Sequence, residues 1–144
     1  MSSLPSHTDT NLVAEAHTSS KITVFICDDV EPVREMVRLT FAGDPDFEVV
    51  GEAANGIAAV LGIKDRQPDV VVLDLDMPEI DGLQVMNVTR VLSPRTRVVV
   101  FSAFPDHTSG GRALRRGAKR LLRKGVSLPE LLDAAREVAL PRAA

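Results

Sequence analysis

Residues 70–82 read VVVLDLDMPEIDG. Four apolar residues lead directly into Asp74, and a second acid, Asp76, stands two positions further on. Burying a carboxylate is costly unless a partner compensates its charge. We therefore predict that a buried strand ends at Asp74. Its side chain either reaches solvent in a loop or lies among residues brought from elsewhere in the chain.

Apolar or β-branched runs recur along the chain and predict strands like the one before Asp74. The predicted strands are residues 22–27, 47–53, 69–73, 97–101 and 118–123. Amphipathic stretches between them predict helices. The predicted helices lie within residues 30–43, 55–67, 82–92, 106–117 and 127–140. In the first helix the residues at helical spacing are Val33, Met36, Val37, Thr40 and Phe41, and a capping box of Ser127 and Glu130 opens the last.

Strand and helix alternate five times, which is typical of an α/β fold with a doubly wound parallel sheet. We expect a flavodoxin-like sheet of five strands in the order 2-1-3-4-5, with helices on both faces. The domain is expected to span residues 21–140. Residues 1–20 are mostly polar and are expected to be a flexible tail, and residues 141–144 a short C-terminal tail.

The composition excludes some classes of protein. No apolar run approaches the length of a membrane span, and the N-terminus lacks the apolar core of a secretory leader. The single cysteine, Cys27, cannot form an internal disulfide, so we expect a cytoplasmic protein in which Cys27 is a small core residue. The net charge of −3 hides an asymmetry: residues 9–89 hold 16 acids and 5 bases, whereas residues 90–124 hold 10 bases and one acid.

Polar residues follow four of the predicted strands. These residues are Asp28, Asp29, Asp74, Ser102 and Lys124. In an open parallel sheet the carboxyl ends of the strands form the ligand site, so these side chains should converge. Three close carboxylates repel one another unless a cation intervenes, and Mg²⁺ suits such oxygen ligands. The arrangement indicates phosphoryl chemistry, with Asp74 as nucleophile and with Ser102 and Lys124 contacting the phosphoryl oxygens.

The chain resembles the receiver domains of bacterial two-component response regulators over residues 21–140. The matching motifs, each weak alone but specific in this order, are CDD (27–29), LDLDMPEIDG (73–82), VVVFSA (98–103) and GAKRLLRKG (117–125). Two further stretches most resemble the receivers that carry helix-turn-helix outputs, namely FEVVGEAANG (47–56) and LPELLDAAREVA (128–139).

The resemblance implies that Asp74 is the phosphoacceptor and that a sensor histidine kinase or phosphotransfer protein is the donor. It implies Mg²⁺ as cofactor, with these ligands: Asp29 directly, Asp28 through water, Asp74, and the backbone carbonyl of Asp76. It also implies that phosphorylation switches an interaction surface. A domain of this kind passes on a signal, so we do not expect an enzyme.

The resemblance further implies that Ser102 is the switch hydroxyl and that Lys124 pairs with the phosphoryl group. Two positions depart from the family pattern. Gly125 replaces the proline that commonly follows the lysine, and Leu121 stands where an aromatic residue is common. These departures concern the loop after the last strand and the coupling to the output surface.

Two other functions remain open from the sequence. VVVLDLDMP also resembles the first motif of haloacid-dehalogenase-type phosphatases, in which Asp74 would attack phosphate and Asp76 would act as acid and base. However, that motif normally continues with Gly-Thr. The second alternative is a receiver-like interaction module that is never phosphorylated.

The basic stretch at residues 112–124 is either a solvated surface or a docking surface for an acidic partner. We expect an output protein, or a second copy of the chain, to bind through residues 103–123. The stretch lacks aromatic residues and a recognition-helix pattern, so direct nucleic-acid binding is not expected.

Overall fold

The computed structural model describes residues 21–103 and 108–141. Five strands form one parallel sheet in the order β2-β1-β3-β4-β5, as predicted. The strands are β1 (Ile22–Cys27), β2 (Phe47–Ala53), β3 (Val70–Leu73), β4 (Arg97–Ser102) and β5 (Arg120–Arg123). The predicted N-terminal tail, and all but Pro141 of the predicted C-terminal tail, lie outside the described residues.

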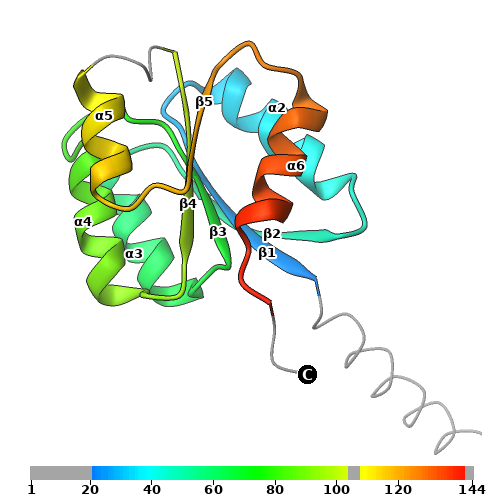
Figure 1. The fold of residues 1–144 in the computed structure, drawn as a ribbon, viewed down its shortest axis with the longest axis horizontal. Helices are drawn as coiled ribbons and strands as arrows, with labels where there is room; N and C mark the ends of the chain where they lie inside the picture. Colours follow the sequence, from blue (N-terminus) through cyan, green and yellow to red (C-terminus); the bar gives the residue numbers. More distant parts are fainter. Residues whose placement is uncertain (1–20, 104–107, 142–144) are drawn as a thin grey trace, which may run out of the picture.

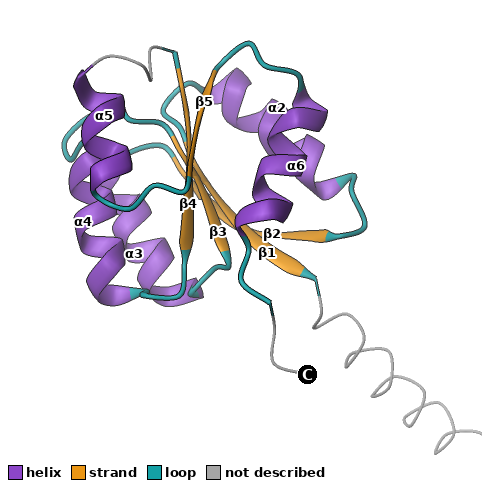
Figure 2. Ribbon diagram, viewed as in Figure 1, coloured by secondary structure: helices purple, strands orange, loops and turns teal. Residues whose placement is uncertain are grey.

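The helices cover both faces of the sheet (Figures 1 and 2). Helices α3, α4 and α5 lie on one face, and α2 and α6 on the other. Their bounds are α2 (Glu31–Ala42), α3 (Gly56–Arg66), α4 (Gly82–Leu92), α5 (Thr108–Arg115) and α6 (Leu128–Val138). This is the doubly wound, flavodoxin-like arrangement that the alternating pattern predicts.

The sheet separates two hydrophobic clusters. Successive residues of β1 point to opposite faces, so Phe25 and Cys27 join the cluster under α3–α5, and Val24 and Ile26 join the cluster under α2 and α6. All four residues of β3 are buried. Because both faces of the central strands are covered, their sequences are uninterrupted apolar runs that end abruptly at polar residues.

Some predicted boundaries need correction. The last strand begins at Arg120 rather than at residue 118, because Ala118 and Lys119 lie in the connection between the turn after α5 and β5. The predicted capping box of α6 is only half formed: Ser127 Oγ accepts a hydrogen bond from the backbone of Glu130 at 3.2 Å, and no hydrogen bond returns from the Glu130 side chain. A complete capping box opens α4 instead, between Asp81 and Gln84.

The apolar face predicted for α2 is only partly buried. Val37 and Phe41 pack in the core, whereas Met36 is 42% exposed. The helix is therefore anchored by two residues one turn apart and presents Met36 and the neighbouring Leu39 to its outer side. Within the described part of the chain, no helix is both long enough and apolar enough to cross a membrane.

Candidate functional site

The four strand ends with polar residues meet at one edge of the sheet. Asp28 and Asp29 follow β1, Asp74 follows β3, Ser102 is the last residue of β4, and Lys124 follows β5. Hydrogen bonds and ion pairs join Asp28, Asp74, Ser102 and Lys124 directly. The prediction that these residues converge is confirmed.

Asp74 lies at the centre of the site and is 3% exposed. Its Oδ1 accepts hydrogen bonds from Ser102 Oγ and from the backbone N–H of Asp76, both at 3.1 Å. Its Oδ2 lies 3.1 Å from Lys124 Nζ. The backbone N–H of Asp74 also donates to the carbonyl of Cys27, which ties the end of β3 to the end of β1. Both carboxylate oxygens of Asp74 are therefore held by hydrogen-bond donors.

Asp28 is as buried as Asp74 and is fixed by its own set of contacts. Its Oδ2 lies 2.8 Å from Lys124 Nζ, and its Oδ1 accepts from the backbone N–H of Val30 at 2.9 Å. Burial raises the pKa of the Asp28 carboxyl, and the nearby charge of Asp74 raises it further, although the bonds from Lys124 and Val30 oppose the shift. The charged form of Asp28 is therefore incompletely compensated by its protein neighbours.

Lys124 is the cation between these two acids. Burial acts to lower the pKa of its ammonium, but the hydrogen bond to Asp28 and the charge of Asp74 outweigh that effect, so the pKa is raised overall. The ammonium group therefore stays protonated at neutral pH and is available to contact anionic oxygens.

Three carboxylates form the candidate metal site. One oxygen each from Asp28, Asp29 and Asp74 lies within 4.8 Å of the others, and Asp29 is exposed to solvent whereas the other two are buried. Three negative charges beside one ammonium leave an excess of negative charge, which a divalent cation would neutralise. The donor set is entirely oxygen, which suits Mg²⁺. Asp76 contributes its backbone N–H to Asp74, and its own side chain is exposed.

Cys27, Leu121 and Gly125 are neighbours of the site for which the sequence also gave expectations. Cys27 is 1% exposed, and burial raises the pKa of its thiol, as expected of a core residue. Leu121 is half-buried and packs against the cluster under α3–α5. Gly125 has a φ of 118°, a conformation that other residues rarely adopt and that proline cannot reach. The loop after β5 therefore follows a path that depends on this glycine.

One contact at the site was not predicted. Arg34, in the first turns of α2, donates from Nη1 to the backbone carbonyl of Asp28 at 2.8 Å. The sequence does not predict this contact, because an arginine on a helix usually points into solvent.

Comparisons with known proteins agree with this geometry. The family model "Response regulator receiver domain" matches residues 24–136. The transcriptional regulatory protein YhcZ of Bacillus subtilis is 39% identical over 109 residues, which are 76% of this chain and 51% of YhcZ. The chemotaxis protein CheY of Listeria monocytogenes is 34% identical over 118 residues, which are 82% of this chain and 98% of CheY.

A solved structure extends the likeness to three dimensions. The signal receiver domain of the response regulator NarL from Mycobacterium tuberculosis matches with a TM-score of 0.74 and 36% identity, covering 81% of this chain and 98% of that domain. The chain thus spans about half the length of YhcZ and nearly the whole of CheY and of the NarL receiver. From the family match, the sheet order and the acidic cluster together, we conclude that this chain belongs to the family of response regulator receiver domains, which accept a phosphoryl group.

Proposed function

We propose that Asp74 accepts the phosphoryl group, in a Mg²⁺-dependent transfer from a histidine kinase or a phosphotransfer protein. The observation that supports this most is the pairing of Asp74 with both Ser102 and Lys124 beside two further carboxylates. A carboxylate oxygen of Asp74 would attack phosphorus, and the bond from phosphorus to the donor's histidine nitrogen would break. The product is an acyl phosphate on Asp74.

The side chains around Asp74 have defined tasks in this proposal. The ammonium of Lys124 and the hydroxyl of Ser102 already contact Asp74, so each needs only a short movement to contact a phosphoryl oxygen. Asp29, Asp28, Asp74 and the backbone carbonyl of Asp76 would hold Mg²⁺. When bound, Mg²⁺ neutralises charge on the phosphoryl oxygens.

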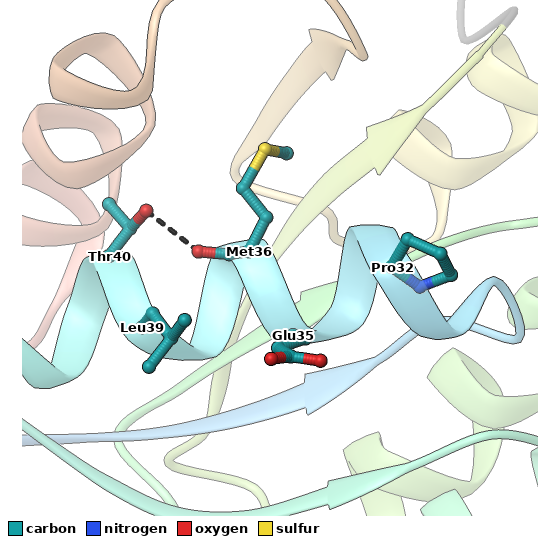
Figure 3. A pocket seen from close by; sticks show the side chains of 5 residues that line it. All are labelled: Pro32, Glu35, Met36, Leu39 and Thr40. Atoms are coloured by element: carbon teal, nitrogen blue, oxygen red, sulfur yellow. Dashed lines mark hydrogen bonds between the residues drawn. The ribbon is translucent and has the colours of Figure 1, made fainter.

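We infer that the donor protein docks on α2. Asp74 is almost fully buried, so the donor must approach over the rim of the site. One hollow of about 250 Å³ lies between α2 and the loop after β5, and its lining includes Met36, Lys124 and Gly125. A second hollow of about 560 Å³ lies along α2 (Figure 3) and is lined by Pro32, Glu35, Met36, Leu39 and Thr40. Met36 lines both hollows, and Lys124, which contacts Asp74, lines the smaller one, so an apolar donor surface seated on α2 would lie beside the phosphoacceptor.

The output surface is proposed to lie on α5 and β5. Within the described residues 108–124, seven bases and no acids occur, and Leu114 is 48% exposed among them. Charge of one sign opposes pairing with an identical surface, so an acidic output protein suits it better than a second copy. We place the protein in the cytoplasm, where kinases of this class act on receivers.

The phosphoacceptor is tested by intact mass spectrometry after incubation with acetyl phosphate and Mg²⁺. The wild-type chain should gain one phosphoryl group, and Asp74→Asn should gain none. Asp65→Asn is a matched control, because Asp65 is an exposed acid of α3 whose side chain pairs only with the adjacent Arg66 within the described chain. Equal labelling of Asp74→Asn and wild type would contradict the proposal.

The two alternative functions predict different results in the same preparation. A haloacid-dehalogenase-type phosphatase would turn over a generic phosphate ester catalytically, whereas the proposed receiver would not. A receiver-like module that is never phosphorylated would keep its unmodified mass with every small-molecule phosphoryl donor. The family match favours the receiver over the phosphatase.

A further inference from the structure

We propose that Arg34 is a positioning residue for the metal-binding loop: it fixes the peptide between Asp28 and Asp29 and thereby sets the affinity for Mg²⁺. This inference rests on the proposed metal site. Within the described residues, the Arg34 side chain bonds to the Asp28 carbonyl and to Glu52, and not to the carboxylate of Asp28, Asp29 or Asp74. Its effect would pass through the backbone of the loop after β1.

The Arg34 guanidinium joins three separate parts of the fold. Its Nη1 donates to the backbone carbonyl of Asp28 at 2.8 Å, and its Nε donates to Glu52 Oε1, near the end of β2, also at 2.8 Å. The Arg34 side chain is 15% exposed, and its bond to the Asp28 carbonyl is partly buried, whereas the bond to Glu52 is exposed to solvent. The planar guanidinium of Arg34 therefore links helix α2, strand β2 and the loop after β1.

Every polar group of Asp28 is already engaged. Its N–H donates to the carbonyl of Ala53, its carboxylate is held by Val30 and Lys124, and its carbonyl is held by Arg34. Because a peptide unit is planar, fixing the carbonyl of Asp28 also fixes the N–H and the Cα of Asp29. The position of Asp29 thus depends on the Arg34 contact.

Asp29 needs this support more than the other two carboxylates. Within the described part of the chain no hydrogen bond or ion pair holds the Asp29 side chain, which is exposed. Asp28 and Asp74, by contrast, are each held by Lys124. Groups that orient a metal ligand alter metal affinity without touching the metal. Loss of the Arg34 contact should therefore weaken Mg²⁺ binding by allowing Asp29 to move.

Arg38 provides a matched control one turn along α2. Its Nε lies 3.2 Å from Glu52 Oε2, so it shares the carboxylate with Arg34, yet it makes no contact with Asp28 in the described structure. Lysine keeps the charge at either position but cannot donate in two directions from one rigid plane. Arg34→Lys and Arg38→Lys therefore both preserve the charge beside Glu52, and only Arg34→Lys breaks the planar bridge between Glu52 and the Asp28 carbonyl.

The experiment compares Mg²⁺ affinities by isothermal titration calorimetry for wild type, Arg34→Lys, Arg38→Lys and Glu52→Gln, with folding checked by circular dichroism. Arg34→Lys should bind Mg²⁺ about tenfold more weakly, in the range found for groups that orient metal ligands. Arg38→Lys should bind like wild type. Glu52→Gln keeps the shape of the acceptor but loses its charge, so its affinity should fall between the two, and it carries the test if Arg34→Lys does not fold.

A second readout uses no metal. In Mg²⁺-free protein, hydrogen exchange of the Val30 amide, which donates to Asp28 Oδ1, should be faster in Arg34→Lys than in wild type and unchanged in Arg38→Lys. Wild-type affinity in both Arg34→Lys and Glu52→Gln would overturn the inference, as would equal weakening by Arg34→Lys and Arg38→Lys. If wild type itself fails to bind Mg²⁺, the proposed metal site is wrong, and this inference falls with it.

Discussion

Lys124 is shared between two carboxylates: its Nζ lies 2.8 Å from Asp28 Oδ2 and 3.1 Å from Asp74 Oδ2. The ammonium thus links the ends of β1, β3 and β5. A phosphoryl group on Asp74 would offer Lys124 new oxygen partners at the same place. The same residue therefore contributes to stability before phosphorylation and to charge neutralisation afterwards.

Lys124→Met should destabilise the protein at neutral pH, because the carboxylates of Asp28 and Asp74 lose this shared cation. We expect a loss of about 2 kcal/mol in the free energy of unfolding, between the values typical of exposed and of buried ion pairs. Urea unfolding at neutral and acidic pH measures the effect. The difference from wild type should shrink on acidification, since protonated carboxyls no longer repel each other, and a constant difference would contradict this explanation.

Asp28→Asn should instead raise the free energy of unfolding at neutral pH in the absence of Mg²⁺. The pKa of Asp28 is raised above its ordinary value of 3.8, so the folded state binds the proton more tightly than the unfolded state. The contribution of Asp28 to stability is therefore greatest at acidic pH and falls as the pH rises through the folded pKa. Asn does not titrate, so in Asp28→Asn the free energy of unfolding should no longer show this decrease with rising pH.

Thermal unfolding of wild type and Asp28→Asn, across pH and with or without Mg²⁺, tests this. Without the metal the variant should be more stable at neutral pH, and the advantage should vanish in acid. Saturating Mg²⁺ should stabilise wild type more than the variant, because only the native wild-type site binds with its full ligand set. A variant less stable than wild type in metal-free neutral buffer would refute the assigned charge imbalance.

Gly125→Pro should restore the family's common residue and yet destabilise this protein. The φ of Gly125 is 118°, whereas proline fixes φ near −65°. We expect a loss of at least about 1 kcal/mol in the free energy of unfolding. Gly111→Ala is the control, because an added Cβ there meets only the flexible end of Arg115, at 3.4 Å.

Gly111→Ala lies within α5 and should raise stability by about 0.5–1 kcal/mol through helix propensity. Both variants can be compared by chemical denaturation. Equal stability of Gly125→Pro and wild type would mean that the loop after β5 can take another path in solution.

Phosphorylation should reorganise α5 more than β5. Gly110 and Gly111 weaken α5, whereas Leu121 is already packed against the core and offers no polar tip that would favour an exposed rotamer. Hydrogen exchange of phosphorylated and free protein should therefore change in Thr108–Arg115 and little in Arg120–Arg123. Changes confined to β5 would instead indicate a switch at Leu121. Part of the surface expected to bind an output protein, residues 104–107, lies outside the described residues.

Much of the fold and of the site could be predicted because their signals are local. Each buried strand is a continuous apolar run, and the polar residue that ends it is adjacent in sequence, so Asp28, Asp74 and Ser102 could be placed from the sequence alone. The capping box of Asp81 and Gln84 is equally local and was missed, although its Asp-x-x-Gln pattern is a known signal of a helix start.

Other features depend on geometry between distant elements. Met36 follows helical spacing like a core residue, yet it is exposed, because only Val37 and Phe41 of the helix face the sheet directly enough to be buried. The bond from Arg34 to the carbonyl of Asp28 depends on how the loop after β1 turns back toward α2. Hydrophobic periodicity carries no information about such a contact between a side chain and a backbone carbonyl.

The central claim is that Asp74 carries the phosphoryl group, and the most direct measurement identifies the modified residue chemically. After reaction with acetyl phosphate and Mg²⁺, borohydride reduction converts an aspartyl phosphate into homoserine. Peptide fragmentation by mass spectrometry can then separate Asp74 from its neighbour Asp76. We predict homoserine at position 74 alone, and only when Mg²⁺ was present. Homoserine at Asp28, Asp29 or Asp76, or at none of the four, would contradict the claim.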